Sequence, residues 1–171
     1  MSMEKYNKIH FIGIGGISMS SLAEILKSKG KTITGSDGVA SNVTKALENI
    51  GIQVSIGQKA ENITPDTDLI VYTAAVKEDN PELMAARASG IETVDRAALV
   101  GMMMLEYKFP LSVAGTHGKT TTSSLVTEIF LAAKANPTVS IGGILPSIKG
   151  NYKVGGEDYF ILETCEYCDS F

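Results

Sequence analysis

The sequence has no tryptophan, and only two of its 171 residues are cysteines. These two, Cys165 and Cys168, have the C-x-x-C spacing, but no second cysteine pair and no nearby histidine completes a zinc site. We therefore expect both to be ordinary reduced thiols, which is the usual state of cysteine in a reducing compartment.

The sequence also lacks a long apolar run and an excess of basic residues. No stretch of about 18 apolar residues occurs and residues 1–7 show no signal-peptide pattern, so neither membrane insertion nor secretion is expected. The net charge of −4 provides no clustered basic surface for nucleic acid. We expect a cytoplasmic location, and the 44% hydrophobic and 20% charged content is typical of a compact α/β protein.

Seventeen glycines are present, and two glycine-rich turns carry most of the functional information. The more informative turn, residues 115–120, lies within the run 112–122. It follows an apolar stretch at 110–114 that predicts a buried strand. Its spacing, G-x-x-G-K-T, is shorter than the general P-loop. Backbone N–H groups of such a turn can face one anion, and a helix beginning at about Lys119 adds its positive end.

Two side chains in this turn match the needs of a nucleoside triphosphate. Lys119 can reach a terminal phosphate oxygen, and the Thr120 hydroxyl can ligate Mg²⁺. The helix expected over 121–133 has apolar residues at Leu125, Ile129, Ala132 and Ala133. A plain loop before an amphipathic helix is the alternative interpretation.

The second glycine turn, residues 13–18, follows a strand predicted over 8–12. In a dinucleotide-type turn the first glycine makes the bend, the second admits the pyrophosphate and a third allows close helix packing; Ser18 stands at the third position. A strand over 32–35 ends at Ser36 and Asp37, and Asp37 falls where an acidic residue would meet a ribose or a base. A purely structural turn between strand and helix is the alternative here.

Strands and helices are predicted to alternate along the chain. Helices are expected over 19–29, 42–49, 80–89 and 95–107, with strands between them. This order predicts a parallel sheet that binds ligands beyond the carboxyl ends of its strands. The fold class is therefore α/β, with a Rossmann-like parallel-sheet domain over 1–107 and the start of an incomplete P-loop ATPase α/β domain over 108–171.

Several motifs together resemble one enzyme family. They are residues 115–122 (GTHGKTTT), residues 11–20 (FIGIGGISMS), Gly35-Ser36-Asp37, Asn80-Pro81-Glu82 and Arg96-Ala97. This set resembles the Mur ligases of bacterial cell-wall synthesis. Members of that family have an N-terminal domain for the UDP part of the substrate, a central ATPase domain and a C-terminal domain for the incoming amino acid, and this chain would correspond to about the first third.

The resemblance implies an ATP-dependent amide synthesis. ATP would phosphorylate the lactyl carboxylate of UDP-N-acetylmuramate, and the amine of L-alanine would attack the resulting acyl phosphate. It implies an ATP site at Gly115, Thr116, His117, Gly118, Lys119, Thr120 and Thr121, with Lys119 and His117 as the candidate catalytic residues. It also implies a UDP-substrate site at Gly13, Gly15, Gly16, Ile17, Ser18, Ser36, Asp37, Thr73 and Ala74.

The roles of two further residues are expected from the same resemblance. His117 would shape the loop or contact phosphate rather than act as a general base, and the alternative is a solvated loop histidine. Residues 163–171 (ETCEYCDSF) resemble a family segment that supplies a carboxylate to Mg²⁺. By that resemblance Glu166 is the Mg²⁺ ligand beside Thr120 and Glu163 is the second choice. A solvated acidic turn is the alternative.

The sequence departs from the family pattern at four positions. Ser18, Ser21, Gln58 and Cys165 replace common family residues. A further Mg²⁺-binding histidine and the amino-acid domain would lie beyond residue 171. We therefore expect no ligase turnover from this chain alone.

Three other functions fit part of the sequence. A nicotinamide-dependent oxidoreductase would explain the first glycine turn and Asp37 but not the Gly-Lys-Thr turn. A non-catalytic nucleotide-binding module would bind nucleotides without preference for the muramoyl group. A ligase of the same family that recycles whole peptides would share the UDP-sugar and differ in its amine substrate. The sequence leaves the oligomeric state open.

Overall fold

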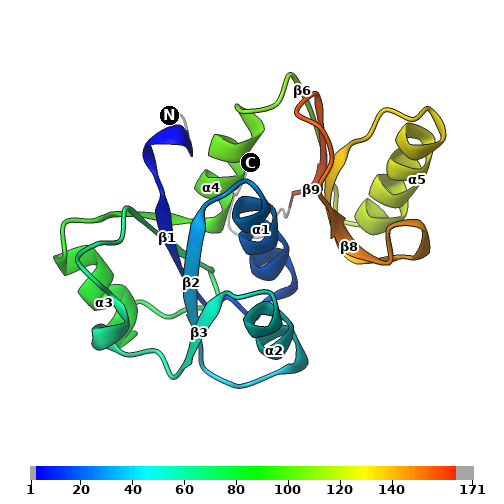
Figure 1. The fold of residues 1–171 in the computed structure, drawn as a ribbon. Coiled ribbons are helices and arrows are strands. Elements are labelled where there is room, and N and C mark those ends of the chain that lie inside the picture. Colours follow the sequence, from blue (N-terminus) through cyan, green and yellow to red (C-terminus); the bar gives the residue numbers. More distant parts are fainter. Residues whose placement is uncertain (1–2, 165–171) are drawn as a thin grey trace. The chain divides into compact units, whose positions relative to one another are not determined.

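The computed structural model describes residues 3–164 and divides into two compact units (Figure 1). The first unit is Glu4–Leu99, and the second unit runs from Val100 onward together with Met3. The division falls inside helix α4 (Arg96–Met104). The domain boundary expected at residue 107 stays a prediction.

The first unit is a five-stranded parallel sheet with helices between its strands. The sheet order is β3-β2-β1-β4-β5, and every neighbouring pair is parallel. This confirms the predicted α/β class. Its strands are β1 (Lys8–Ile12), β2 (Thr32–Asp37), β3 (Gln53–Ile56), β4 (Leu69–Tyr72) and β5 (Glu92–Asp95); its helices are α1 (Ile17–Ser28), α2 (Asn42–Asn49) and α3 (Pro81–Ala88), with short 3-10 turns η1 (Met3–Lys5) and η2 (Ala60–Asn62).

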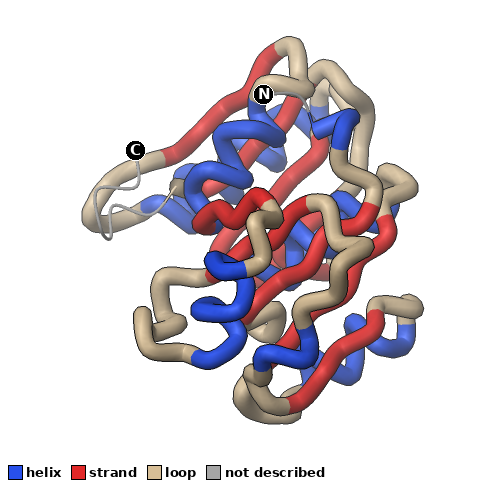
Figure 2. Tube along the Cα trace, turned by 90° about the vertical axis from the view of Figure 1, so that its left-hand side faces the viewer, coloured by secondary structure: helices blue, strands red, loops and turns tan. Residues whose placement is uncertain are grey.

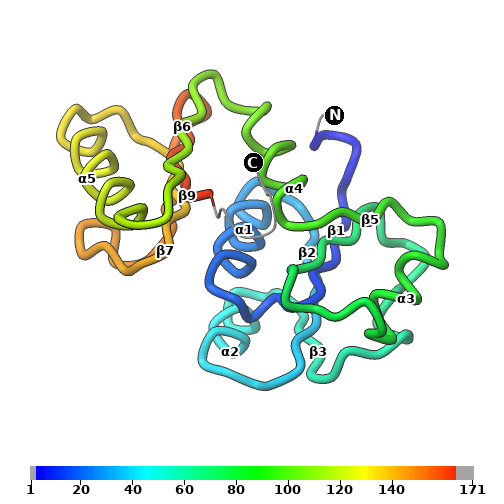
Figure 3. Tube along the Cα trace, turned by 180° about the vertical axis from the view of Figure 1, so that it is seen from behind, coloured from blue at the N-terminus to red at the C-terminus, as the bar shows by residue number. Residues whose placement is uncertain are grey.

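Helices cover both faces of this sheet. Helices α1 and α2 lie on one face and α3 on the other, as Figures 1 and 3 show from opposite sides. Under α3, Ile12 and Ile70 of the sheet pack against Leu83 and Ala86 of the helix. The chain builds outward from β1 to β3 and then returns to β4 on the other side of β1, so the strand order reverses between β1 and β4. Ligands of open α/β sheets bind at such a reversal.

Local signals in the sequence fix where the helices begin and end. Ser41 caps α2 through a reciprocal pair of hydrogen bonds: its hydroxyl accepts from the Thr44 N–H at 3.2 Å, and its own N–H donates to the Thr44 hydroxyl at 2.9 Å. Gly30 follows α1 with a φ of +86°, a conformation that favours glycine. The predicted bounds therefore differ from the observed ones by only a few residues.

The second unit is a four-stranded mixed sheet with one long helix on it. Its order is β6-β9-β7-β8, with β6, β9 and β7 parallel and β8 antiparallel to β7. Figure 2 shows all described strands in red and all helices in blue. Its elements are β6 (Phe109–Val113), α5 (Lys119–Ala132), β7 (Thr138–Leu145), the 3-10 turn η3 (Pro146–Ile148), β8 (Gly150–Lys153) and β9 (Tyr159–Glu163).

One expectation for the second unit is wrong about burial. Strand β6 was expected to be buried, yet Phe109 is 49% and Leu111 37% exposed, because β6 is an edge strand that pairs only with β9. Helix α5 forms as predicted, but Leu125 and Ile129 lie 61% and 65% exposed.

The face of α5 that does pack on the sheet is partly polar. Ser123 and Thr127 are fully buried, and the half-buried Val126 and Phe130 pack on a core of Val139, Ile141, Leu145 and Ile161. The Thr127 hydroxyl donates to the Ser123 carbonyl at 2.8 Å, and the Ser123 hydroxyl donates to Glu163 Oε1 at 2.6 Å. Both buried hydroxyls therefore have partners. Across residues 3–164, no helix combines the length and the apolar character needed to cross a membrane.

Candidate nucleotide-binding sites

The glycine turn of the first unit follows β1 directly at the strand reversal. Gly13 has a φ of +82°, and the N–H groups of Gly13 and Ile14 both donate to the Ser36 carbonyl, at 2.8 and 2.9 Å. Helix α1 then begins at Ile17, and its N-cap, Gly16, has no side chain to cap it. A helix start beside a glycine turn is a suitable place for an anion.

Asp37 holds this turn in place. Its Oδ2 accepts from the Gly15 N–H at 2.9 Å, and its Oδ1 accepts from the Val39 N–H at 3.2 Å. A Cβ added to Gly15 would lie 2.8 Å from that same Oδ2 and 3.2 Å from Thr44 Cγ2. A side chain at position 15 would therefore displace the Asp37 carboxylate from its contact with the turn.

The loop after β4 forms the neighbouring wall. Thr73 lies beside the turn, since a Cβ on Gly13 would come 2.6 Å from Thr73 Cγ2, and Ala74 follows it as an exposed residue. Among the residues predicted for this site, the structure thus brings Gly13, Gly15, Asp37 and Thr73 together. Ser36 is different: its side chain is fully buried and its hydroxyl donates to Glu82, away from the exposed side of the turn.

Arg96 belongs to this site although sequence reasoning did not include it among the binding residues. It begins α4 right after β5, and its Nη1 donates to the Ser18 hydroxyl at 3.3 Å. A half-buried guanidinium therefore lies at the start of α1, where it adds positive charge. The available signal was its position at the carboxyl end of a strand in the same sheet.

The glycine turn of the second unit follows β6 and leads into α5. Gly115 and Gly118 have φ values of +145° and +76°, and Gly118 is the N-cap of the helix. Lys119 Nζ donates to the Gly115 carbonyl at 2.5 Å, so the side chain folds back over the turn. Thr116, His117 and Thr121 are exposed.

Thr120 contacts an acidic residue from the neighbouring strand. Its hydroxyl donates to Glu163 Oε2 at 3.1 Å, and the Ser123 hydroxyl donates to Glu163 Oε1 at 2.6 Å. Glu163 ends β9, where it is in register with Val113 at the end of β6. Glu166, the first choice as metal ligand, lies outside the described residues, whereas the second choice, Glu163, contacts Thr120.

A glycine pair in β7 makes room for this contact. A Cβ on Gly142 would lie 2.8 Å from Glu163 Oε2 and 3.3 Å from Thr120 Oγ1, and one on Gly143 would lie 2.8 Å from Thr120 Cγ2. Sequence reasoning did not include Ser123, Gly142 or Gly143, although paired glycines inside a strand indicate close approach of another group.

The donor set at Thr120 and Glu163 fits Mg²⁺. A hydroxyl and a carboxylate are hard oxygen donors, and Mg²⁺ is usually bound by one or two such protein groups together with substrate phosphates and water. In the described part of the chain no group of three or more His, Cys, Asp or Glu side chains could hold a metal by itself. This site would therefore need oxygen ligands from a phosphate or from solvent.

Known proteins similar to this chain point in the same direction. Residues 8–108 match the model of the Mur ligase family, catalytic domain. UDP-N-acetylmuramate–L-alanine ligase from Agathobacter rectalis is 59% identical over 95% of the chain and 36% of the relative, and the enzyme of that name from Acetivibrio thermocellus is 54% identical over 98% and 35%. The chain spans about a third of the length of these curated relatives, and it matches their N-terminal region.

Solved structures show the same fold. UDP-N-acetylmuramate–alanine ligase MurC from Thermotoga maritima has a TM-score of 0.83 at 37% identity, covering 91% of this chain and 36% of its own. UDP-N-acetylmuramate:L-alanyl-gamma-D-glutamyl-meso-diaminopimelate ligase from Neisseria meningitides has a TM-score of 0.85 at 29% identity, covering 95% and 53%. Because the family model covers more than half of its residues, and the fold matches that of a solved alanine ligase, this chain belongs to the Mur ligase family.

Proposed function

We propose that this chain supplies the UDP-sugar site and part of the ATP site of a UDP-N-acetylmuramate–L-alanine ligase. The observation that carries the proposal is the contact of Thr120 with Glu163 behind a Gly-Lys-Thr turn, in a chain whose other unit has a second glycine turn at its strand reversal. The whole enzyme would join the lactyl carboxylate of UDP-N-acetylmuramate to L-alanine at the expense of ATP, in the cytoplasm. Relatives of that name at 54% and 59% identity support this assignment.

In the first unit, the turn at residues 13–18 would bind the diphosphate of the UDP-sugar. The backbone N–H groups at the start of α1 would donate hydrogen bonds to the anion, and Arg96, placed beside Ser18, would add a full positive charge. Thr73 and Ala74 would line the opposite wall. Asp37 would act mainly by fixing Gly15, since its carboxylate already accepts that N–H.

In the second unit, the turn at residues 115–118 and Lys119 would bind the β and γ phosphates of ATP. Lys119 would exchange its bond to the Gly115 carbonyl for phosphate oxygens. Thr120 and Glu163 would hold Mg²⁺, which when bound neutralises charge on the phosphates. His117, exposed in the turn, would contact phosphate or shape the loop, and Glu166 remains a prediction beyond the described residues.

A ligase that transfers whole peptides is the second candidate. The Neisseria structure, whose name specifies a tripeptide rather than L-alanine, has a TM-score as high as that of the alanine ligase structure. Both kinds of enzyme would share the two sites proposed here. The amine substrate separates them, and its choice would depend on residues outside this chain.

Calorimetric titration tests the first site. Wild-type chain should bind UDP-N-acetylmuramate and UDP saturably and should not bind NADH. Gly15→Val should abolish this binding because its side chain would collide with Asp37, whereas Gly38→Ala, whose Cβ meets no atom within 4 Å, should retain it. Binding of NADH without UDP would contradict the proposal and favour an oxidoreductase.

The second site is tested separately with ATP. Lys119→Ala should weaken ATP binding with or without Mg²⁺, whereas Glu163→Gln should weaken it only when Mg²⁺ is present. Equal ATP affinity of Glu163→Gln and wild type in Mg²⁺ would remove Glu163 from the metal site. No turnover is expected from the chain alone, so ADP release that requires both UDP-N-acetylmuramate and L-alanine would contradict that expectation.

A further inference from the structure

Four hydrogen-bonded side chains, those of Ser36, Glu82, His10 and Thr34, form a polar chain on the face of the first unit's sheet that α3 covers. The Glu82 carboxylate is completely buried; one oxygen accepts from the Ser36 hydroxyl at 2.6 Å, and the other lies 2.7 Å from His10 Nε2. His10 Nδ1 in turn lies 2.8 Å from the Thr34 hydroxyl. In the tautomer that carries its proton on Nε2, the ring donates to the carboxylate and Nδ1 accepts from the Thr34 hydroxyl, so both ring nitrogens have a partner.

The motif Asn80-Pro81-Glu82 delivers this carboxylate. Asn80 Oδ1 accepts from the N–H groups of Glu82 and Leu83, at 3.0 and 3.1 Å, and Pro81 occupies the first turn of α3. Asn80 Nδ2 also donates to Gln58 Oε1 at 2.7 Å, which fixes the cap itself. Glu82 therefore lies in the first turn of α3, at the positive end of the helix, where a negative charge is favoured. Its carboxylate contacts Ser36 and His10 of the sheet.

At its other end the polar chain reaches the glycine turn. Ser36 is the residue whose carbonyl accepts the N–H groups of Gly13 and Ile14. Its hydroxyl is held by Glu82, so the position of this carbonyl depends on a residue from α3 that lies under the sheet. The turn is thus fixed from two sides, by Asp37 through Gly15 and by Ser36 through Gly13 and Ile14.

A buried polar chain at this place is weak evidence for a gain in stability. An apolar cluster that includes Ile12, Ile70 and Leu83 packs under the same helix, whereas the His10 and Thr34 end of the polar chain faces a pocket with polar walls. Replacement of a buried polar pair by apolar residues of similar volume is often neutral or stabilising, whereas removal of one partner is costly. Geometric definition of the atoms at its end is what such a network offers that an apolar core would not.

We infer that Glu82 and His10 are positioning residues for the UDP-sugar site, which act through Ser36 on Gly13 and Ile14. This inference rests on the proposed function of the glycine turn. Neither side chain touches the proposed ligand position, so both act by fixing the direction of the turn's backbone N–H groups.

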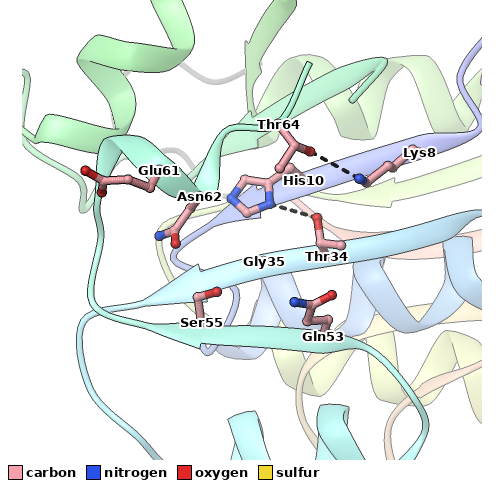
Figure 4. Close-up of a pocket in the computed structure, with 9 residues that line it drawn as sticks. All are labelled: Lys8, His10, Thr34, Gly35, Gln53, Ser55, Glu61, Asn62 and Thr64. Carbon is pink, nitrogen blue, oxygen red and sulfur yellow. Dashed lines mark hydrogen bonds between the residues drawn. The ribbon is translucent and has the colours of Figure 1, made fainter. Parts of the chain in front are cut away.

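The outer end of the polar chain adjoins a small pocket (Figure 4). The pocket has a volume of about 140 Å³ and is lined by His10 and Thr34, together with Gln53 and Ser55 of β3 and Asn62 of η2. A His10→Ala variant would enlarge this pocket, so added imidazole could enter and replace the missing ring.

The first test measures amide hydrogen exchange by NMR and needs no ligand. Glu82→Leu, which keeps volume but accepts no hydrogen bond, should raise the exchange rates of the Gly13 and Ile14 amides about tenfold. Glu82→Gln should restore protection, because its amide oxygen accepts from Ser36 while its N–H donates to the other tautomer of His10. Thr67→Val removes another buried hydroxyl of the same unit, which lies 3.1 Å from the Thr64 hydroxyl, and is the matched control.

The second test measures affinity for UDP-N-acetylmuramate by calorimetry. Kd should rise about tenfold in Glu82→Leu and in His10→Ala, return toward wild type in Glu82→Gln, and recover in His10→Ala on addition of imidazole. Thermal unfolding of each variant separates loss of affinity from loss of fold.

The two tests fail in distinguishable ways. If wild-type chain binds no UDP ligand, the proposed function fails, and the exchange rates still decide whether Glu82 positions the turn. If the Gly13 and Ile14 amides exchange in Glu82→Leu as they do in Thr67→Val, the inference is overturned whatever the affinity for UDP.

Discussion

Substitution of Gly35 by alanine tests the packing behind the first glycine turn. A Cβ at this position would lie 2.6 Å from Ile14 Cδ1, 2.9 Å from Ile14 Cβ and 2.8 Å from the carbonyl oxygen of Phe11. The Ile14 side-chain tip can rotate, but the Phe11 oxygen belongs to the central strand β1 and would have to move by about 0.6 Å to reach ordinary contact. Overpacking of this kind costs about 1–3 kcal/mol, offset by up to about 1 kcal/mol because alanine restricts the unfolded chain.

We therefore expect Gly35→Ala to lower the free energy of unfolding of the first unit by about 1–2 kcal/mol. Hydrogen exchange of peptides from β1 and β2 over a urea series follows this unit separately from the other. With a urea slope of about 1–3 kcal/mol per molar, the midpoint should fall by roughly 0.3–2 M. Gly38→Ala is the control, since its Cβ meets no atom within 4 Å. A Gly35→Ala midpoint equal to that of the control would refute the steric argument.

Four further changes have defined outcomes. Gly142→Ala should displace the Glu163 carboxylate, because its Cβ would come within 2.8 Å of Oε2, and a titration with ATP should show reduced Mg²⁺ dependence. Ser41→Ala should cost about 1 kcal/mol in urea unfolding, since it removes the cap of α2. Phe160→Ala should cost about 3–5 kcal/mol, as this ring is fully buried, and loss of near-ultraviolet circular dichroism on mild heating would report it. Two backbone N–H groups, those of Lys8 and Asn7, hold the pKa of Asp68 below its usual range. The stabilisation by Asp68 is thus complete above the ordinary carboxyl pKa and is lost as pH falls through the lower folded value, so the stability difference between wild type and Asp68→Asn should shrink only in that acidic range.

The first unit was predictable from the sequence because its local signals agree with its tertiary structure. Ser41 and Gly30 mark helix ends through hydrogen bonds and backbone angles that depend on neighbouring residues only. The second unit was less predictable. Strand β8 is a short, largely polar segment that is held by pairing with β7, so its own four residues carry little periodic signal.

Pairings between distant residues were the main part of the sites that the sequence could not predict. The family resemblance left Glu163 as second choice, and its contact with Thr120, between the end of β9 and the start of α5, favours it. Likewise Ser36 was expected to contact the ligand, whereas its hydroxyl is bound by Glu82 from a helix far along the chain. No local pattern in the sequence connects these two residues, because their contact depends on the order of strands in the sheet.

The central place of β1 sets the order in which the first unit can be completed during synthesis. Strand β1 is made first, yet one of its two neighbours, β4, ends only at Tyr72. At ribosomal rates of about 5–20 residues per second, synthesis from the end of β1 to the end of β4 takes roughly 3–12 s. During that time one edge of β1 has no partner strand. Helix α1 and strand β2 follow directly and can cover part of that surface in the meantime. The arrangement that places the glycine turn at the centre of the sheet therefore also leaves its strand as an unpaired apolar edge on the nascent chain, where chaperones that bind apolar segments would act.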